Sequence, residues 1–158
     1  MDYIASFMRH EQVSGKYNDD LVHLPRWTEQ EWLRLFARGQ FHSVRASEIV
    51  IQRDAIDRAL HFIAAGTLEV GVTYVDGMSF SPLAKISAGS VIGEQSFFDG
   101  LPRSASVWAV VDCELLTLPY AEYEAFAQDD ALLAKELLFA LGRVLSMRLR
   151  NTTVRIRR

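Results

Sequence analysis

The chain has 158 residues, of which 49% are hydrophobic and 23% charged, an ordinary balance for one folded domain. The net charge of −3 gives no overall attraction to nucleic acid, and the single cysteine, Cys113, excludes an internal disulfide and a cysteine-rich metal site. No apolar run reaches the about eighteen residues of a membrane span, and the N-terminus is unlike a signal peptide, so we expect a cytoplasmic protein.

The N-terminal part of the chain predicts an arm followed by a helix. Residues 1–23 are polar, contain glycine and show no periodicity, so we expect a loose N-terminal arm before a single domain at residues 24–158. Thr28 and Glu31 have the spacing of a capping box, which marks the start of a helix. The residues that continue and end this helix are Trp32, Leu35, Phe36 and Gly39.

From Phe41 the pattern changes to short β-rich runs separated by turns, at residues 43–51, 60–63, 67–75, 78–80, 90–92, 105–111 and 113–118. Asp76-Gly77 is a strong hairpin signal between two of these runs. The turn at residues 52–57 has no glycine, and we expect an aspartate to take the left-handed position there. The spacing predicts a mainly β fold with flanking helices, in which seven or eight strands form an antiparallel barrel or jelly roll.

After Pro119 the period becomes helical again. Pro119 suits the first turn of a short helix over residues 120–128. Asp129 or Asp130 is expected to cap a long C-terminal helix that runs to about Arg150. One stripe of that helix is apolar and is expected to pack on the barrel or to form a dimer seam: Ala134, Leu138, Leu141, Leu145 and Leu149.

One acid and one arginine, Glu94 and Arg103, stand close together in a segment of small, apolar and turn-forming residues. Taken alone, such a pair is typical of a surface ion pair, but in this setting it indicates a pocket for an anion. The guanidinium of Arg103 can give two charge-assisted hydrogen bonds to phosphate oxygens, and the hydroxyl of Ser104 one more. Gly93 lets the backbone approach a ligand closely, and the residues after it can form one helical turn whose amides favour a negative charge.

This segment, Gly93-Glu94 followed by Pro102-Arg103-Ser104-Ala105-Ser106-Val107, closely resembles the phosphate-binding cassette of the cyclic nucleotide-binding domain family. The resemblance extends roughly over residues 24–151 and implies an antiparallel β-roll with an N-terminal helix and a long C-terminal helix. The ligand it implies is a cyclic nucleotide, cAMP or cGMP, with cAMP the expected one. The residues it implies for the ligand site are Gly93, Glu94, Gln95, Ser96, Arg103, Ser104 and Ala105.

The resemblance also implies roles for single residues. Arg103 and Ser104 would hold the phosphate, while Glu94 would accept a hydrogen bond from the ribose 2′-hydroxyl and balance the charge of Arg103. Arg143 and Arg148, on the C-terminal helix, are candidates to cap the base.

Two outputs are compatible with this resemblance. The first is a regulatory domain that signals by movement of its C-terminal helix, as a lid or a dimer seam, to a second copy or to a partner protein. The second is a member that keeps the cassette but binds no nucleotide and serves as a dimerisation or protein-interaction module.

The C-terminal residues indicate which kinds of binding partner can be expected. Only eight residues follow Arg150, too few for the helix-turn-helix domain of many bacterial relatives, so specific DNA binding is not expected. The chain looks like the stand-alone or transporter-appended bacterial type, with the effector or transporter unidentified. The arginines of the last residues are expected to be a solvated helix end, or a contact for an acidic partner or nucleic acid.

No enzyme is expected, because the chain has no nucleophile with a companion base and no glycine-rich phosphate loop of the nucleotide-hydrolysing type. His10, His23 and His42 lack the spacing of metal ligands, so no metal site and no cofactor are predicted. His61 is expected to be a half-buried strand residue and Cys113 a packed strand residue.

Overall fold

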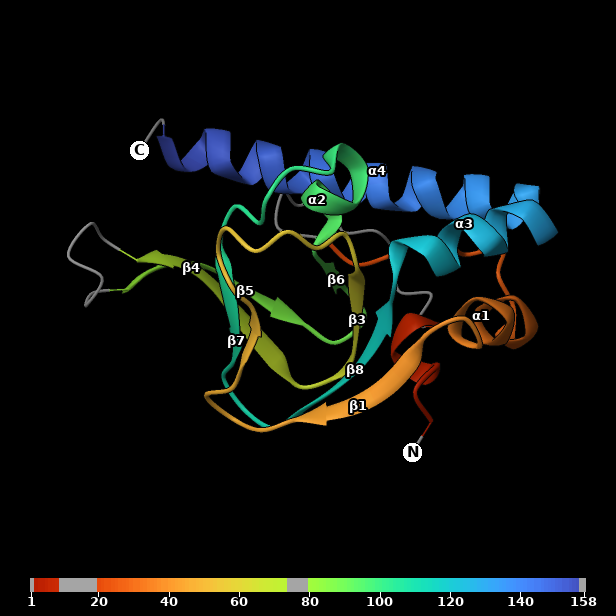
Figure 1. Cartoon of the computed structure of the whole chain (residues 1–158), viewed down its shortest axis with the longest axis horizontal. Helices are drawn as coiled ribbons and strands as arrows, with labels where there is room; N and C mark the ends of the chain where they lie inside the picture. The colour runs from red at the N-terminus through yellow and green to blue at the C-terminus, as the bar shows by residue number, and fades with distance from the viewer. Residues whose placement is uncertain (1, 9–19, 74–79, 157–158) are drawn as a thin grey trace.

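The structure is a computed structural model that describes residues 2–8, 20–73 and 80–156. Its strands form two four-stranded sheets in which every pairing is antiparallel. In Figure 1 the two sheets face each other as a roll, with the longest helix lying along one side. The predicted antiparallel β-roll is therefore confirmed.

Each sheet combines strands that are far apart in the sequence. The first sheet has the order β1 (Gln40–Val44), β8 (Cys113–Leu118), β3 (Leu60–Ala65) and β6 (Val91–Ile92). The second has the order β2 (Ile49–Ile51), β7 (Ser106–Ala109), β4 (Thr67–Thr73) and β5 (Phe80–Ser87). Asp76-Gly77 lies outside the described residues, but the strands before and after it pair antiparallel, with Thr73 opposite Phe80.

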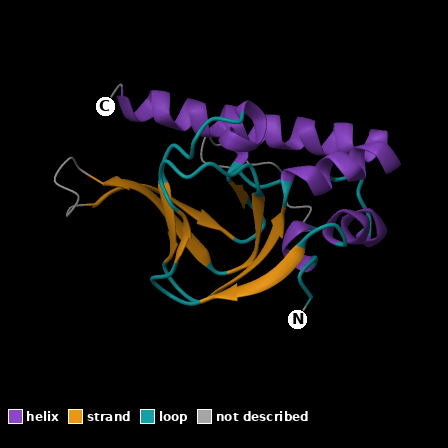
Figure 2. Cartoon of the chain, viewed as in Figure 1, coloured by secondary structure: helices purple, strands orange, loops and turns teal. Residues whose placement is uncertain are grey.

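The helices gather on one side of the strands (Figure 2). They are the short 3₁₀ helix η1 (Ala5–Phe7), α1 (Glu29–Phe36), α2 (Glu94–Asp99), α3 (Tyr120–Asp129) and α4 (Ala131–Ile156). The first sheet separates two apolar clusters, because alternate residues of a strand face opposite sides. On β3, Phe62 packs on the helix side, whereas Ile63 packs inside the roll. The roll is thus closed on its helix side by a continuous core.

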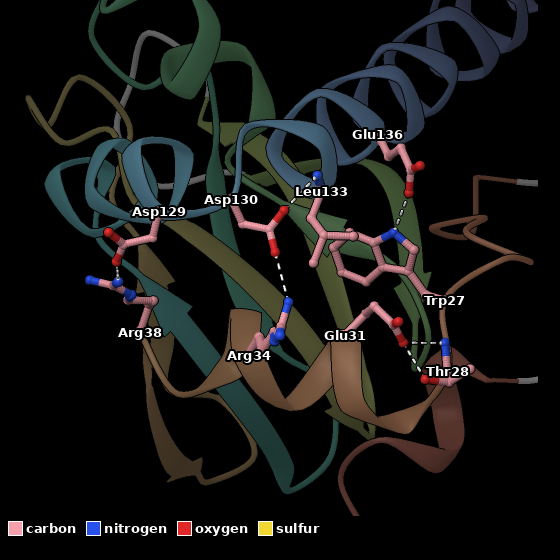
Figure 3. Close-up of polar contacts among 9 residues, drawn as sticks. All are labelled: Trp27, Thr28, Glu31, Arg34, Arg38, Asp129, Asp130, Leu133 and Glu136. Atoms are coloured by element: carbon pink, nitrogen blue, oxygen red, sulfur yellow. Dashed lines mark hydrogen bonds and ion pairs between the residues drawn. The ribbon is translucent and has the colours of Figure 1, made fainter.

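α1 begins where the sequence predicted. The carboxylate of Glu31 accepts a hydrogen bond from the backbone N–H of Thr28 at 2.7 Å, which completes the capping box (Figure 3). Trp32 and Leu35 are fully buried, and the helix ends after Phe36.

The expectation of a loose arm does not hold for the described residues before α1. Ile4, Phe7 and Val22 are buried in the core between the helices and the first sheet. The ring of Phe7 lies 5.1 Å from that of Trp32 and 5.9 Å from that of Phe62, centroid to centroid. The apolar residues around Ile4 and Phe7 form a run of only about six positions, too short to show a helical or strand period, which is why the sequence did not reveal this packing.

The C-terminal helix begins after a well-placed cap and is longer than predicted. Asp130 ends α3, and its side chain accepts a hydrogen bond from the amide of Leu133 at 3.4 Å (Figure 3). α4 then continues to Ile156 instead of ending near Arg150. None of the helices that the structure describes combines the length and the apolar character that a bilayer span needs.

The predicted apolar stripe of α4 is only partly correct. Ala134 and Leu141 are buried, but Leu138 is 36% exposed and Leu149 is 68% exposed. The buried face is rotated toward a neighbouring set of residues, Leu133, Ala134, Leu137, Ala140, Leu141 and Val144. The helix is apolar around more of its circumference than one contact with the roll requires, so its periodicity did not identify the packed side.

Candidate functional site

A cavity of about 390 Å³ lies within the roll and reaches α2 and the C-terminal half of α4. Its volume is in the range of small-molecule sites. All seven residues predicted for the ligand site line it, namely Gly93, Glu94, Gln95, Ser96, Arg103, Ser104 and Ala105. The rest of the wall is Asp20, Ile51, Val70, Leu83, Ala84, Lys85, Ile86, Ile92, Val107, Arg148, Asn151 and Thr152.

Arg103 is a buried cation in the wall of this cavity, only 3% exposed. Its Nη1 donates to the carbonyl of Gly93 at 2.9 Å, and its Nη2 donates to the carbonyl of Ala59 at 2.7 Å. The same Nη2 lies 3.2 Å from the Asp57 carboxylate. A buried charge needs such partners, because leaving water without them costs several kcal/mol. The Nε of Arg103 has no hydrogen-bond partner among the described residues.

Gly93 makes room for this guanidinium. Its backbone has φ = +88°, in the left-handed region. A Cβ at this position would lie 2.6 Å from Nη1 of Arg103 and 2.7 Å from the carbonyl oxygen of Ala59. Any side chain here would therefore push Arg103 out of its place.

The turn at residues 52–57 is part of the site, although the sequence placed it outside the cassette. Asp54 has φ = +71°, which is the left-handed aspartate that the sequence predicted. Its amide donates to the carbonyl of Arg103, and the amide of Arg103 donates to the carbonyl of Ala55, both at 2.9 Å. The turn is thus bonded to the backbone of Arg103, and it supplies Asp57 to the side chain.

Asp57 remains charged beside Arg103. Partial burial acts to raise the pKa of Asp57, but hydrogen bonds from the Ala59 amide and from Arg103 outweigh it, and the pKa lies below its ordinary value.

Glu94 is balanced by Arg148 and not by Arg103, which corrects the expectation from the sequence. Glu94 is 6% exposed, and its Oε2 lies 2.7 Å from Nη1 of Arg148. Arg148 comes from α4, so this ion pair connects the cassette to the C-terminal helix. Burial acts to lower the pKa of Arg148, but the charges of Glu94 and Asp20 outweigh it and raise the pKa.

Ser104 and Gln95 close the outer rim of the cavity. The hydroxyl of Ser104 donates to the side-chain oxygen of Gln95 at 2.5 Å. Both side chains are exposed, so they can exchange this bond for one to a ligand.

The two candidates for capping the base lie in different places. Arg148 lines the cavity, whereas Arg143 is absent from the described lining, and its Nη1 donates to the carbonyl of Leu21 at 3.3 Å. Arg143 therefore contacts the N-terminal segment beside α4.

Sequence reasoning missed four polar residues of the wall: Asp20, Lys85, Asn151 and Thr152. Asn151 and Thr152 follow Arg148 on α4 by about one helical turn, so extending the predicted helix beyond residue 150 would have pointed to them. Nothing in the local sequence marks Asp20, which reaches the cavity from a segment more than seventy positions before the cassette.

His61 and Cys113 are buried components of the roll. Nδ1 of His61 lies 2.9 Å from the hydroxyl of Thr117 on the neighbouring strand. At 7% exposure His61 is buried, not half-buried as expected. Burial, aided by the charge of Arg103, lowers the pKa of His61 to about 4. Burial also raises the pKa of the Cys113 thiol, which fits the packed strand residue predicted.

In the ranges that the structure describes, no three or more histidine, cysteine, aspartate or glutamate side chains are grouped so that they could hold a metal ion.

Comparison with known families settles what kind of domain this is. A model of the cyclic nucleotide-binding domain matches residues 41–130, more than half of the chain. The chain belongs to the cyclic nucleotide-binding domain family. The family predicted from the cassette is thereby confirmed.

Two curated proteins are similar to this chain in sequence. The cAMP-activated global transcriptional regulator Vfr of Pseudomonas aeruginosa is 26% identical over 140 residues, which cover 86% of this chain and 62% of that protein. The cyclic AMP receptor protein of Thermus thermophilus is 36% identical over 88 residues, which cover 56% of this chain and 40% of that protein. The chain thus spans less than two thirds of either relative.

A solved member of the family has the same fold over nearly the whole chain. The cyclic nucleotide-binding domain from Methylobacillus flagellatus superposes with a TM-score of 0.80, covering 98% of this chain and 82% of that chain at 21% identity. The shared architecture therefore includes the helices outside the β-roll as well as the roll.

Proposed function

We propose that this domain is a cAMP sensor in which Arg103 holds the cyclic phosphate and Glu94 accepts a hydrogen bond from the ribose 2′-hydroxyl. The proposal rests on the hydrogen-bond donors of Arg103. It is a buried cation in a cavity wall, and two of its five N–H groups, on Nε and Nη1, have no partner among the described residues. A phosphate oxygen is the group that such donors bind best.

The other end of the ligand would meet Glu94. Its Oε2 is taken by Arg148, but a carboxylate has two oxygens and about four lone pairs, so an acceptor remains for a hydroxyl. Glu94 directly follows Gly93, whose carbonyl accepts a hydrogen bond from Arg103, so the two proposed roles fall in adjoining parts of the same wall.

The purine would lie in the remaining part of the cavity, between the second sheet and α4. Val70 and Ile86 offer apolar surface there, while Lys85, Asn151 and Thr152 offer polar groups. The names of the two curated relatives, a cAMP-activated regulator and a cyclic AMP receptor protein, favour cAMP over cGMP. A cyclic nucleotide signal also agrees with the cytoplasmic location expected from the sequence.

The sensor would transmit its signal through α4. Ligand can act only through a difference in affinity between two positions of that helix. Because Arg148 of α4 is paired with Glu94, a ligand that engages Glu94 necessarily acts on this connection.

Isothermal titration calorimetry with cAMP and cGMP, up to about 1 mM nucleotide, tests the proposal. We expect wild-type protein to bind cAMP more tightly than cGMP, and Arg103→Ala to lose roughly a hundredfold or more in affinity with the loss of two charge-assisted hydrogen bonds. Arg45→Ala is the matched control, since Arg45 is an exposed arginine outside the cavity lining. If neither nucleotide binds to the wild type, or if Arg103→Ala binds as well as the control, the proposal is wrong.

A second candidate function rests on the exposed apolar face of α4. Leu138 is 36% exposed, Phe139 74% and Leu149 68%, and these residues occupy one side of the helix. Apolar residues grouped in this way favour a homodimer seam, with or without ligand. Sedimentation analysis should then show a dimer that Phe139→Glu dissociates and that Leu33→Glu, at an exposed position of α1, leaves intact. A monomeric wild type at all concentrations and nucleotide loads would exclude the seam.

A further inference from the structure

The segment from residue 20 to residue 38 runs along the C-terminal helices in the reverse direction. Asp20 contacts Arg148, and the carbonyl of Leu21 accepts a hydrogen bond from Arg143. Farther along, the contacts descend toward the start of α4: Trp27 with Glu136, Arg34 with Asp130, and Arg38 with Asp129. Figure 3 shows these last three contacts: Trp27 reaches Glu136 within α4, whereas Arg34 and Arg38 reach Asp130 and Asp129 at the α3–α4 junction. We call residues 20–38 the strap.

The start of the strap lies in the wall of the ligand cavity. Asp20 lines the cavity, and its carboxylate lies 2.9 Å from Nε of Arg148. Its backbone is fixed as well, since its carbonyl accepts a hydrogen bond from the hydroxyl of Ser90 at 2.6 Å. The backbone of Asp20 is therefore held by the residue that directly precedes β6.

Arg148 is held by four groups at once. Nε faces Asp20, Nη1 faces Glu94 at 2.7 Å, and Nη2 donates to the carbonyl of Val91 at 2.7 Å and to the hydroxyl of Ser90 at 3.1 Å. A planar guanidinium presents these donors in a fixed arrangement, so fixing Nε also fixes the direction of Nη1. Asp20 and Glu94 thus lie on one rigid connector, with Glu94 at the end where the ribose is proposed to bind.

We propose that Asp20 is a positioning residue of the nucleotide site: it orients Arg148, Arg148 orients Glu94, and the strap thereby sets how well the site binds a ribose 2′-hydroxyl. This inference rests on the proposed function. It extends the ligand site to a segment outside the region that matches the family model, residues 41–130.

A change at Asp20 has two effects that must be separated. Removing its negative charge makes the cavity more positive, which favours any ligand with a phosphate. Loosening Arg148 and Glu94 acts only on a ligand that has a 2′-hydroxyl. The ratio of the affinities for cAMP and 2′-deoxy-cAMP cancels the first effect and keeps the second.

The test measures both affinities by calorimetry on the full chain. For the wild type we expect cAMP to bind more tightly than 2′-deoxy-cAMP. Asp20→Asn should reduce this preference by about three- to tenfold, the worth of one net hydrogen bond. Asp20→Glu, which keeps the charge, should restore part of it. Asp129→Asn removes a strap contact at the far end, with Arg38, and should leave the preference unchanged.

Arg148→Lys supplies a second variant if Asp20→Asn does not fold, as judged by its circular dichroism melting curve. A lysine keeps the charge but cannot join both carboxylates in a fixed geometry, so the preference should fall as well. The inference is overturned if Asp20→Asn or Arg148→Lys weakens both ligands equally, which would mark a merely structural role, or if the preference stays at the wild-type value. If the wild type binds no nucleotide, the proposed function and this inference are both wrong. If the wild type binds cAMP but the variants keep its preference over 2′-deoxy-cAMP, only the inference is wrong.

Discussion

The guanidinium of Arg58 lies over the ring of Tyr120, with its Cζ 3.6 Å from the ring centroid. The same side chain donates from Nη2 to the carbonyl of Phe97 at 2.8 Å, in the last turn of α2. Arg58 therefore joins the cassette helix to the start of α3. The ring of Phe97 strengthens this connection, since it packs edge-on against Tyr120 and Tyr123.

Arg58→Met should lower the free energy of unfolding by about 1–2 kcal/mol, because the apolar stem is kept but the cation–π contact and one hydrogen bond are lost. Urea denaturation followed by tryptophan fluorescence measures the change. Arg45→Met, at an exposed position, serves as the control and should unfold like the wild type. Equal midpoints for the two variants would show that Arg58 contributes nothing to the connection.

Asp54→Gly should stabilise the protein. Asp54 has φ = +71°, a conformation that costs an L-residue about 1 kcal/mol and that glycine adopts freely. The gain is reduced by the greater freedom of glycine in the unfolded chain, so we expect about 0.5 kcal/mol or somewhat more. Asp54→Ala keeps the strain and should not stabilise. A melting temperature that rises with alanine as much as with glycine contradicts this account.

Gly93→Ala should destroy the ligand site, because a Cβ there would lie 2.6 Å from Nη1 of Arg103, in a left-handed backbone conformation that strains any residue with a Cβ. We expect a loss of about 2 kcal/mol or more in stability, from steric overlap and backbone strain together, and no measurable nucleotide binding. Gly142→Ala is the matched control: nothing lies within 4 Å of its added Cβ, and alanine favours a helix by about 0.5–1 kcal/mol. The idea fails if Gly93→Ala keeps wild-type affinity.

The low pKa of buried His61 should lower the free energy of unfolding in mild acid. Its pKa is about 4 in the folded state, below the 6.5 of an unfolded histidine, so between these values the unfolded chain binds the extra proton. The contribution of neutral His61 to the free energy of unfolding is therefore fully present above pH 6.5. It is lost as the pH drops toward 4, and the loss is about 3 kcal/mol for this pKa shift.

Urea denaturation of the wild type and of His61→Gln at several pH values measures this effect. The amide of glutamine can still bond to Thr117 but does not titrate, so the slope between pH 6.5 and 4 should flatten in the variant. Asp57, whose lowered pKa stabilises the folded state above its unfolded value of 3.8, acts in a more acidic range. An unchanged slope in the variant would show that another group causes the acid sensitivity.

Local sequence was sufficient for the parts of this molecule that depend on local geometry. The capping box at Thr28 and the left-handed Asp54 each follow from preferences of a few neighbouring residues. The strand runs were predicted less well: residues 43–51 belong to two strands, β1 and β2, in different sheets, and β5 extends to Ser87, well beyond the predicted run 78–80. The cassette also lies within one short segment, so the residues that line the cavity around Glu94 and Arg103 could be predicted together.

The partners of those residues could not be predicted in the same way. Glu94 is paired with Arg148 and Arg103 with Asp57, and both pairings depend on how distant segments pack. The contribution of Asp20 is of the same kind. The packed face of α4 was misplaced for a different reason: leucines such as Leu138 and Leu149 continue the apolar pattern on the exposed side, and hydrophobic periodicity does not distinguish a contact with the roll from an open surface.

The packing of the N-terminal segment has a practical consequence for cutting the protein into smaller pieces. A fragment that starts at residue 41, the first residue of the family match, would lack Phe7, Trp27 and the whole of α1. Phe62 would lose its aromatic neighbour Phe7, and the buried start of α4 would be exposed to water. Such a fragment should aggregate or bind ligand poorly even though it contains every residue of the cassette. A minimal version of this domain therefore has to begin upstream of η1, at the first residues of the chain.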